Sequence, residues 1–133
     1  DADIKRPRKG LDDGILVRLE DTSAPDEGIP DAWAGVETLA PIGNHNGSPN
    51  SLLHATIPAG GAIAPHALRN AEAIYFVEKG TGEAEGDSAP EEIRQESFVF
   101  VPKGTSHTIR NTGSVPMELF VVLTGAGSLA AAV

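Results

Sequence analysis

The sequence contains no cysteine, which excludes disulfide bridges and thiolate ligands for a metal ion. Positive charge is also scarce, because ten lysine and arginine residues face nineteen aspartate and glutamate residues, for a formal net charge of −9. An acidic protein repels the phosphate backbone of a nucleic acid, so we expect no nucleic-acid partner. No apolar run approaches the roughly 20 residues that a bilayer-spanning helix needs. We therefore expect no membrane partner and a cytoplasmic location.

Helical patterning is almost absent as well. Only Ser128–Val133 has a helix-favouring composition, and a segment this short forms no stable helix in isolation. The chain instead has fifteen glycines and ten prolines, placed between short apolar runs. This pattern predicts an all-β protein of about ten short antiparallel strands, typical of a sandwich, jelly roll or barrel. The expected strands are Ile15–Leu19, Trp33–Ile42, Leu52–Ile57, Ala62–Leu68, Ala73–Lys79, Glu83–Gly86, Glu91–Gln95, Phe98–Val101, Thr105–Arg110 and Met117–Leu123.

No linker or change of composition divides these runs, so we expect one domain over residues 1–133. The charged residues that precede the first run predict a flexible N-terminal arm over about residues 1–12. The residues after about 124 are expected to form a short C-terminal tail.

Two windows of the sequence, residues 58–80 and 96–111, resemble the two motifs of the cupin superfamily in their order and spacing. The matching positions are Gly60, His66 and Gly80 in the first motif, and Pro102, Gly104, His107 and Asn111 in the second. The resemblance implies a single-domain, RmlC-like cupin, whose fold is a jelly-roll β-barrel with a pocket in its interior. It further implies a small-molecule substrate or ligand and a homodimer.

The first motif departs from the cupin pattern at two positions. A second histidine belongs where this sequence has Leu68. Counted back from Gly80, the glutamate position falls on Ala73, whereas a count forward from Leu68 reaches Glu72. We favour Ala73, because the following residues form one continuous strand. Side chains alternate along a strand, so Glu72 then points away from the pocket unless a bulge turns it.

A divalent metal ion (Fe, Zn, Ni or Mn) remains a candidate cofactor if another side chain replaces the missing ligands. His54 lies on an apolar run that the cupin topology places near the strand of His66. His54, His66 and His107 would then form a three-histidine site, with Glu72 as a further candidate ligand. The alternative for His54 is a half-buried strand residue with a backbone or hydroxyl partner. We expect His45, in a polar loop, at the surface.

His66 and His107 are also candidates for acid–base catalysis without a metal, because an imidazole titrates near neutral pH. The alternative is that both are structural remnants of a metal site. Strand alternation puts Tyr75 on the same face as Ala73, where its phenol would contact the substrate or fill the core. Trp33, the single tryptophan, is expected to anchor the core or a dimer contact. The apolar Leu68 and Ala73 suit a carbon-rich ligand.

The sequence thus predicts a small-molecule enzyme of the isomerase, cyclase or lyase type, with His66, His107 and Tyr75 as catalytic candidates. One alternative is a cupin that binds a small molecule without catalysis. A metal-dependent dioxygenase is the other.

Overall fold

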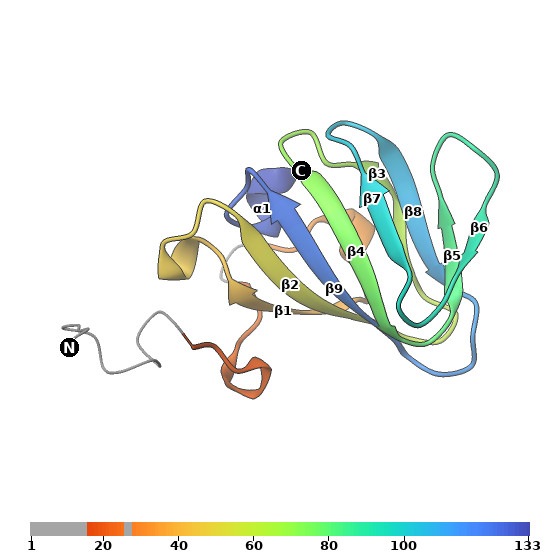
Figure 1. Ribbon diagram of the computed structural model, residues 1–133, viewed down its shortest axis with the longest axis horizontal. Helices are drawn as coiled ribbons and strands as arrows, with labels where there is room; N and C mark the ends of the chain where they lie inside the picture. Colours follow the sequence, from red (N-terminus) through yellow and green to blue (C-terminus); the bar gives the residue numbers. More distant parts are fainter. Residues whose placement is uncertain (1–15, 26–27) are drawn as a thin grey trace.

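Two antiparallel β-sheets form the body of the protein. The computed structural model describes residues 16–25 and 28–133. Figure 1 shows the strands of the two sheets and the loops that join them. The described residues contain the strands β1 (Glu37–Ile42), β2 (Ser51–Ile57), β3 (Ala62–Ala67), β4 (Glu72–Lys79), β5 (Gly82–Glu85), β6 (Glu91–Ile93), β7 (Phe98–Val101), β8 (Ser106–Asn111) and β9 (Met117–Thr124).

One sheet has five strands in the order β1-β2-β9-β4-β7, and the other has four in the order β3-β8-β5-β6. Every strand pair is antiparallel. Strands far apart in the sequence therefore become neighbours, as β2 and β9 do. This arrangement confirms the predicted all-β jelly roll.

Alternation along the strands explains how the core forms between the sheets. In β9, every second residue from Met117 to Leu123 is buried, and the residues between them are partly exposed. In β4, Ala73, Tyr75 and Val77 are buried in the same way. Side chains on one face of a strand recur with period two, so each strand contributes one apolar face to a shared core.

The structure corrects two of the predicted strands. Ile15 lies outside the described residues, and the rest of the expected first strand contains no strand: Leu19–Asp21 form a 3-10 turn. Another 3-10 turn, Asp31–Trp33, replaces the start of the second predicted strand, and β1 begins only at Glu37. Gly35 lies between them at a φ of 83°, a left-handed conformation that a strand does not adopt. The predicted flexible arm over about residues 1–12 lies outside the described residues.

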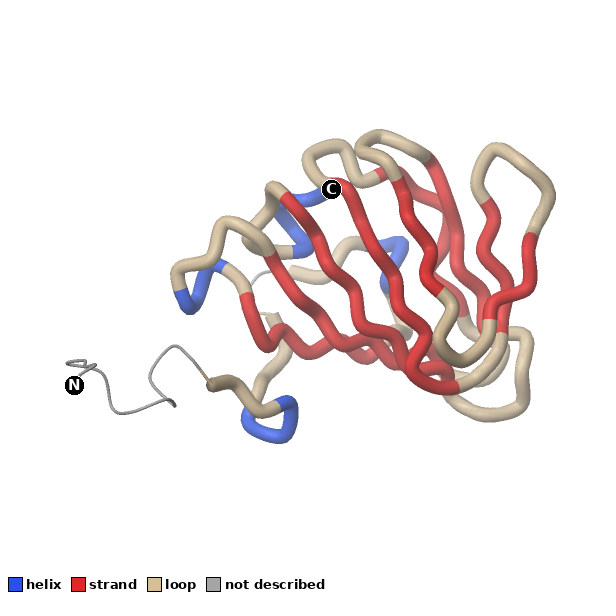
Figure 2. Tube along the Cα trace, in the orientation of Figure 1, coloured by secondary structure: helices blue, strands red, loops and turns tan. Residues whose placement is uncertain are grey.

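The C-terminal tail packs against the body of the protein. It forms the short helix α1 (Leu129–Ala132), where the Ala131 backbone N–H donates to the Ser128 side chain at 3.0 Å. Leu129 and Ala132 are buried, so core contacts stabilise a helix too short to form alone. In Figure 2 the helical segments are short compared with the strands of the two sheets. None of the helices among the described residues is long and apolar enough to cross a membrane.

Candidate functional site

His66 and His107 form a cross-strand pair on the inner face of the four-stranded sheet. Strands β3 and β8 pair so that His66 lies opposite His107, and their ring centroids are 5.1 Å apart. The register shifts between Ile63 and His66, so β3 carries one extra residue there. Without this bulge, Ile63 and His66 would point to opposite faces, because they are an odd number of positions apart. The bulge therefore brings His66 to the face that Ile63 already occupies.

Tyr75 reaches His107 from the opposite sheet. It lies on β4, is fully buried, and its Oη is 2.8 Å from His107 Nε2. The backbone oxygen of Thr105 lies 3.0 Å from the other ring nitrogen of His107, Nδ1. A carbonyl oxygen only accepts, so Nδ1 carries a hydrogen and donates it to Thr105. In the neutral ring, Nε2 then accepts the Tyr75 hydroxyl hydrogen.

Trp33 is the hydrogen-bond donor to His66, as Tyr75 is to His107. Its indole Nε1–H donates to His66 Nε2 at 3.1 Å, and His66 Nδ1 donates to the Ala64 backbone oxygen at 3.0 Å. The Trp33 ring also stacks on Tyr75, at a centroid distance of 6.5 Å and an interplanar angle of 25°. Trp33, His66, Tyr75 and His107 thus form one connected group, which we call the aromatic cluster.

Burial favours the neutral form of both histidines of the cluster. Desolvation lowers the pKa of His66, and only its bond to the Ala64 carbonyl opposes that effect. Desolvation also lowers the pKa of His107. The bond to the Thr105 carbonyl raises this pKa, whereas the charge of a protonated His66 nearby lowers it further. Burial raises the pKa of Tyr75 far above its usual range, so the phenol remains a hydrogen-bond donor.

The two histidines differ in whether the protonated ring keeps its hydrogen-bond partner. An indole nitrogen has no lone pair to offer, so a proton on His66 Nε2 would face the Trp33 N–H. A hydroxyl both donates and accepts, so a protonated His107 can keep its bond to Tyr75 with the roles reversed. His107 can therefore gain a proton without losing a partner, whereas His66 cannot.

A cavity of about 480 Å³ opens between β7 of one sheet and the β5–β6 hairpin of the other. Of the aromatic cluster, His107 is the member that lines it, together with apolar side chains such as Ile93 and Val101. Acidic residues of the β5–β6 hairpin are among those that line this space, and no lysine or arginine is among the lining residues. The acidic lining residues are Glu85, Asp87, Glu91 and Glu92. Arg110 lies outside this lining and forms ion pairs with Glu83 and Glu85, at 3.1 and 3.0 Å.

The interior does not fit the metal site that the cupin resemblance implies. Leu68 and Ala73 are both buried and offer no ligand atom. The Nε2 lone pairs of His66 and His107 are already occupied by hydrogens from Trp33 and Tyr75. Two engaged imidazoles do not make the three or four free ligands that a bound divalent ion requires.

Glu72 does not supply a third ligand. It is exposed, and its carboxylate accepts a hydrogen bond at 3.3 Å from Thr124, its neighbour on β9. Ala73, the next residue, points into the core instead. The preference for Ala73 as the inward position thus agrees with the burial of β4, and Glu72 as a ligand beside His66 is corrected.

His54 does not join the other two histidines either. Its neighbours Leu53 and Ala55 face the core, so alternation turns His54 to the outer face of the five-stranded sheet. There its Nε2 lies 3.3 Å from a carboxylate oxygen of Glu78 and 3.3 Å from one of Glu118. This corrects the three-histidine site. The His54–Glu78–Glu118 group is itself able to hold a metal ion.

Sequence reasoning missed Glu78, Glu118 and the bond from Trp33 to His66. The two glutamates carry a recognisable signal, because each is an acidic residue at an outward position of a strand whose other outward residues are mostly apolar. Trp33 gives no such signal. Its contact depends on a turn 33 positions before His66, and no local pattern encodes that distance.

Comparisons with known proteins agree with the fold. A family described as the cupin domain matches residues 53–123. An uncharacterised protein of Methanocaldococcus jannaschii is 29% identical over 75 residues, which cover 56% of this chain and 60% of that protein. The match thus spans less than two thirds of that relative's length.

Two solved structures are similar across most of the chain. One is a predicted oxalate decarboxylase from Thermotoga maritima, with a TM-score of 0.68 and 24% identity, covering 81% of this chain and 96% of that one. The other is a polyketide cyclase from Streptomyces resistomycificus, with a TM-score of 0.68 and 19% identity, covering 81% and 77%. At these identities the likeness shows a shared fold and not a shared substrate.

Proposed function

Because the chain belongs to the cupin domain family, we propose that its cavity binds a small carbon-rich molecule and that His107, paired with Tyr75, acts on it as a general acid–base. The reaction class that suits such a pair is isomerisation, cyclisation or elimination. Each of these transfers a proton within the substrate or from it to the departing group, and needs no external electron acceptor.

The observation that carries this proposal is the 2.8 Å bond between Tyr75 and His107 at the wall of the cavity. To take a proton from the substrate, His107 Nε2 needs the Tyr75 hydroxyl to turn its hydrogen away. The new N–H of His107 then donates to Tyr75 Oη, so the protonated ring keeps its partner. A base at the cavity wall whose charged form stays hydrogen-bonded matches the needs of enolisation or ring closure.

The charges around the cavity support a neutral or cationic ligand. Four acidic residues and no lysine or arginine are among its lining residues, and one of the four, Glu85, is paired with Arg110. The remaining negative charge beside the cavity would repel an anion. Oxalate carries two negative charges, and this lining offers it no ion pair. The oxalate decarboxylase to which the chain is similar therefore does not suggest the substrate, whereas a polyketide-like carbon skeleton suits the apolar and acidic walls.

Binding without catalysis is the second candidate function, and one observation favours it. Both histidines of the aromatic cluster already have partners on each ring nitrogen. A site built only to hold a ligand needs no free base. A metal-dependent dioxygenase fits less well, because the interior lacks the ligand set described above.

A ligand screen followed by turnover assays tests the proposal. The panel contains neutral ketones and polyphenols, small amines, and dicarboxylates that include oxalate, with binding measured by the shift in thermal unfolding. We expect stabilisation by neutral or cationic compounds and none by oxalate. For each compound bound, His107→Gln should lower turnover by about 10²- to 10⁴-fold.

His45→Gln is the matched control, because His45 is exposed on a loop. That variant should keep full binding and turnover. Ligands that bind but are not converted would favour the second candidate function. Stabilisation by oxalate, or turnover that survives in His107→Gln, would contradict the proposal.

A further inference from the structure

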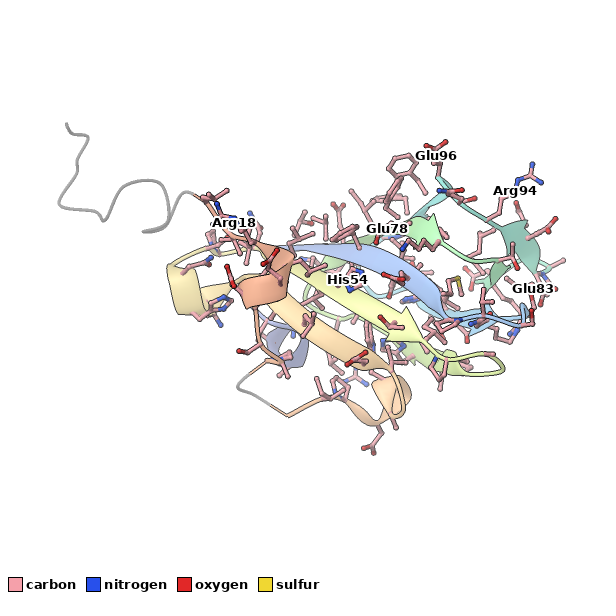
Figure 3. The ribbon with its side chains drawn as sticks, turned by 90° about the horizontal axis from the view of Figure 1, so that it is seen from below. Arg18, His54, Glu78, Glu83, Arg94 and Glu96 are labelled. Carbon is pink, nitrogen blue, oxygen red and sulfur yellow. The ribbon has the colours of Figure 1, made fainter. Side chains whose placement is uncertain are left out.

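The outer face of the five-stranded sheet carries a group of ligating side chains that the cavity does not use. His54 comes from β2, Glu118 from β9 and Glu78 from β4, three strands that lie side by side in the sheet. The candidate ligand atoms of the three all lie within 4.8 Å of one another. Figure 3 shows His54 and Glu78 on their strands, with β9 between them.

We propose that His54, Glu78 and Glu118 bind a zinc ion at this place, on the face of the sheet opposite the cavity. The ion would be separate from the aromatic cluster, since the core residues Leu53 and Ala55 lie on the other side of β2. Its role follows from its position: it joins three strands from outside and stabilises the sheet.

The backbone arranges this convergence. The pairing of β4 with β9 shifts between Val77 and Lys79, so two residues of β4 stand opposite Glu118. Glu78 keeps the outward direction that alternation gives Ile74 and Phe76. Its carboxylate reaches across β9 to the ring of His54, which lies two strands away in the sheet.

Packing fixes the imidazole in place. His54 is only 6% exposed, and its ring packs edge-on against Phe120 at a centroid distance of 5.0 Å. Its Nε2 is directed at both carboxylates. A rigid, largely buried imidazole loses little freedom when it binds an ion, whereas a mobile surface histidine would lose more.

Charge favours a divalent cation. The two glutamates contribute two negative charges, and Lys79 offsets part of this through a 3.8 Å contact with Glu118. The Lys79 side chain is 66% exposed, so its effect is screened by water. A single hydrogen on His54 Nε2 must be shared between two acceptors, whereas a divalent ion would contact all three groups at once.

The distances suit zinc. Two ligand atoms that bind a tetrahedral ion at about 2.0–2.1 Å lie about 3.3–3.4 Å apart. The two separations from His54 Nε2 are both 3.3 Å. An imidazole nitrogen with carboxylate oxygens is a ligand set that zinc accepts readily, whereas calcium and magnesium prefer oxygen ligands alone. Both glutamates are partly exposed, which leaves the fourth coordination position to water.

Calorimetric titration of the metal-stripped full chain with zinc chloride tests the proposal. We expect one zinc ion per chain, with affinity at least tenfold weaker in His54→Gln and in Glu118→Gln. Glu118→Gln keeps the shape of the side chain and thus guards against a loss caused by misfolding. Zinc should also raise the thermal unfolding temperature of the wild-type protein and not that of His54→Gln.

His45→Gln and the cavity variant His66→Gln are the controls, and both should bind zinc as the wild-type protein does. The proposal is overturned if zinc does not bind, or if His54→Gln binds it unchanged. It is also overturned if His66→Gln abolishes binding, because the ion would then lie in the interior. The failure of this proposal leaves the proposed function untouched, since that function requires no metal.

Discussion

At the scale of single residues, His66 and His107 are distinguished by the donors that face them. The cupin resemblance treats them alike, and the sheet pairs them directly. Trp33 offers His66 a donor that cannot become an acceptor, whereas the Tyr75 hydroxyl can exchange roles with His107. We therefore propose the acid–base role for His107 and a positioning role for His66.

Replacing Tyr75 by phenylalanine tests the value of the bond to His107. The ring would still fill its place in the core, but the buried Nε2 of His107 would lose its donor. We expect the free energy of unfolding to fall by about 1–3 kcal/mol in urea titrations.

A double-mutant cycle with His107→Gln provides the control for this loss. If the Tyr75–His107 bond is the cause, the two effects should be less than additive. Full additivity, or an unchanged unfolding free energy in Tyr75→Phe, would show that the bond contributes nothing to stability.

At the scale of elements, the cavity depends on how the β5–β6 hairpin is held against β8. Gly82 begins β5, between Ile93 of β6 and Asn111 of β8. A Cβ atom at this position would overlap the backbone oxygen of Arg110 and also press on the Met117 methyl group. Close backbone approach is what glycine permits here, and this contact holds β5 against β8, both of which contribute lining residues to the cavity.

Gly82→Ala should consequently force β5 away from β8 and destabilise the protein by about 1–3 kcal/mol. Urea titration measures the loss, and hydrogen exchange should localise it to β5 and β6. Gly86→Ala, near the other end of β5, is the control, because its nearest atom would be 3.8 Å from the new methyl group. Equal stability of the two variants would argue against a tight β5–β8 contact.

At the scale of the whole molecule, the buried histidines link stability to pH. In the unfolded chain a histidine titrates near pH 6.5, whereas burial lowers the pKa of both His66 and His107 in the folded protein. Between pH 6.5 and those lower values, the unfolded state binds more protons than the folded state. Stability must therefore fall as the pH drops through this range, and be insensitive to these groups above it.

Urea titrations between pH 5 and pH 8 would measure this dependence. We expect the unfolding free energy to decrease below about pH 6.5 in the wild-type protein. The decrease should be smaller in the variant that carries both His66→Gln and His107→Gln, and unchanged in His45→Gln. The same slope in all three proteins would mean that other groups cause it.

The homodimer expected from the cupin resemblance stays a prediction, and the molar mass in solution tests it. Phe98 and Phe100 on the edge strand β7 are 71% and 58% exposed. Large apolar side chains exposed together favour contact with another protein surface, so they mark where a second copy would bind.

Alternating apolar residues and turn-forming glycines and prolines were sufficient to predict most strands of this protein, because these signals act between near neighbours in the chain. The same alternation placed Ala73 and Tyr75 inside. Motif spacing identified His66 and His107 as candidate site residues, and the structure places them opposite each other on β3 and β8. The sequence by itself therefore determined the fold class and the central pair of the candidate site.

Only the tertiary structure decided which side chains the histidines meet. The partner of His66 comes from a turn and the partner of His107 from the opposite sheet. His54 has the residue type of a metal ligand, yet alternation within β2 sends it to the outer face, beside glutamates from β4 and β9. Such contacts depend on strand order, register and bulges, which pair residues far apart in the chain and leave no local pattern to read.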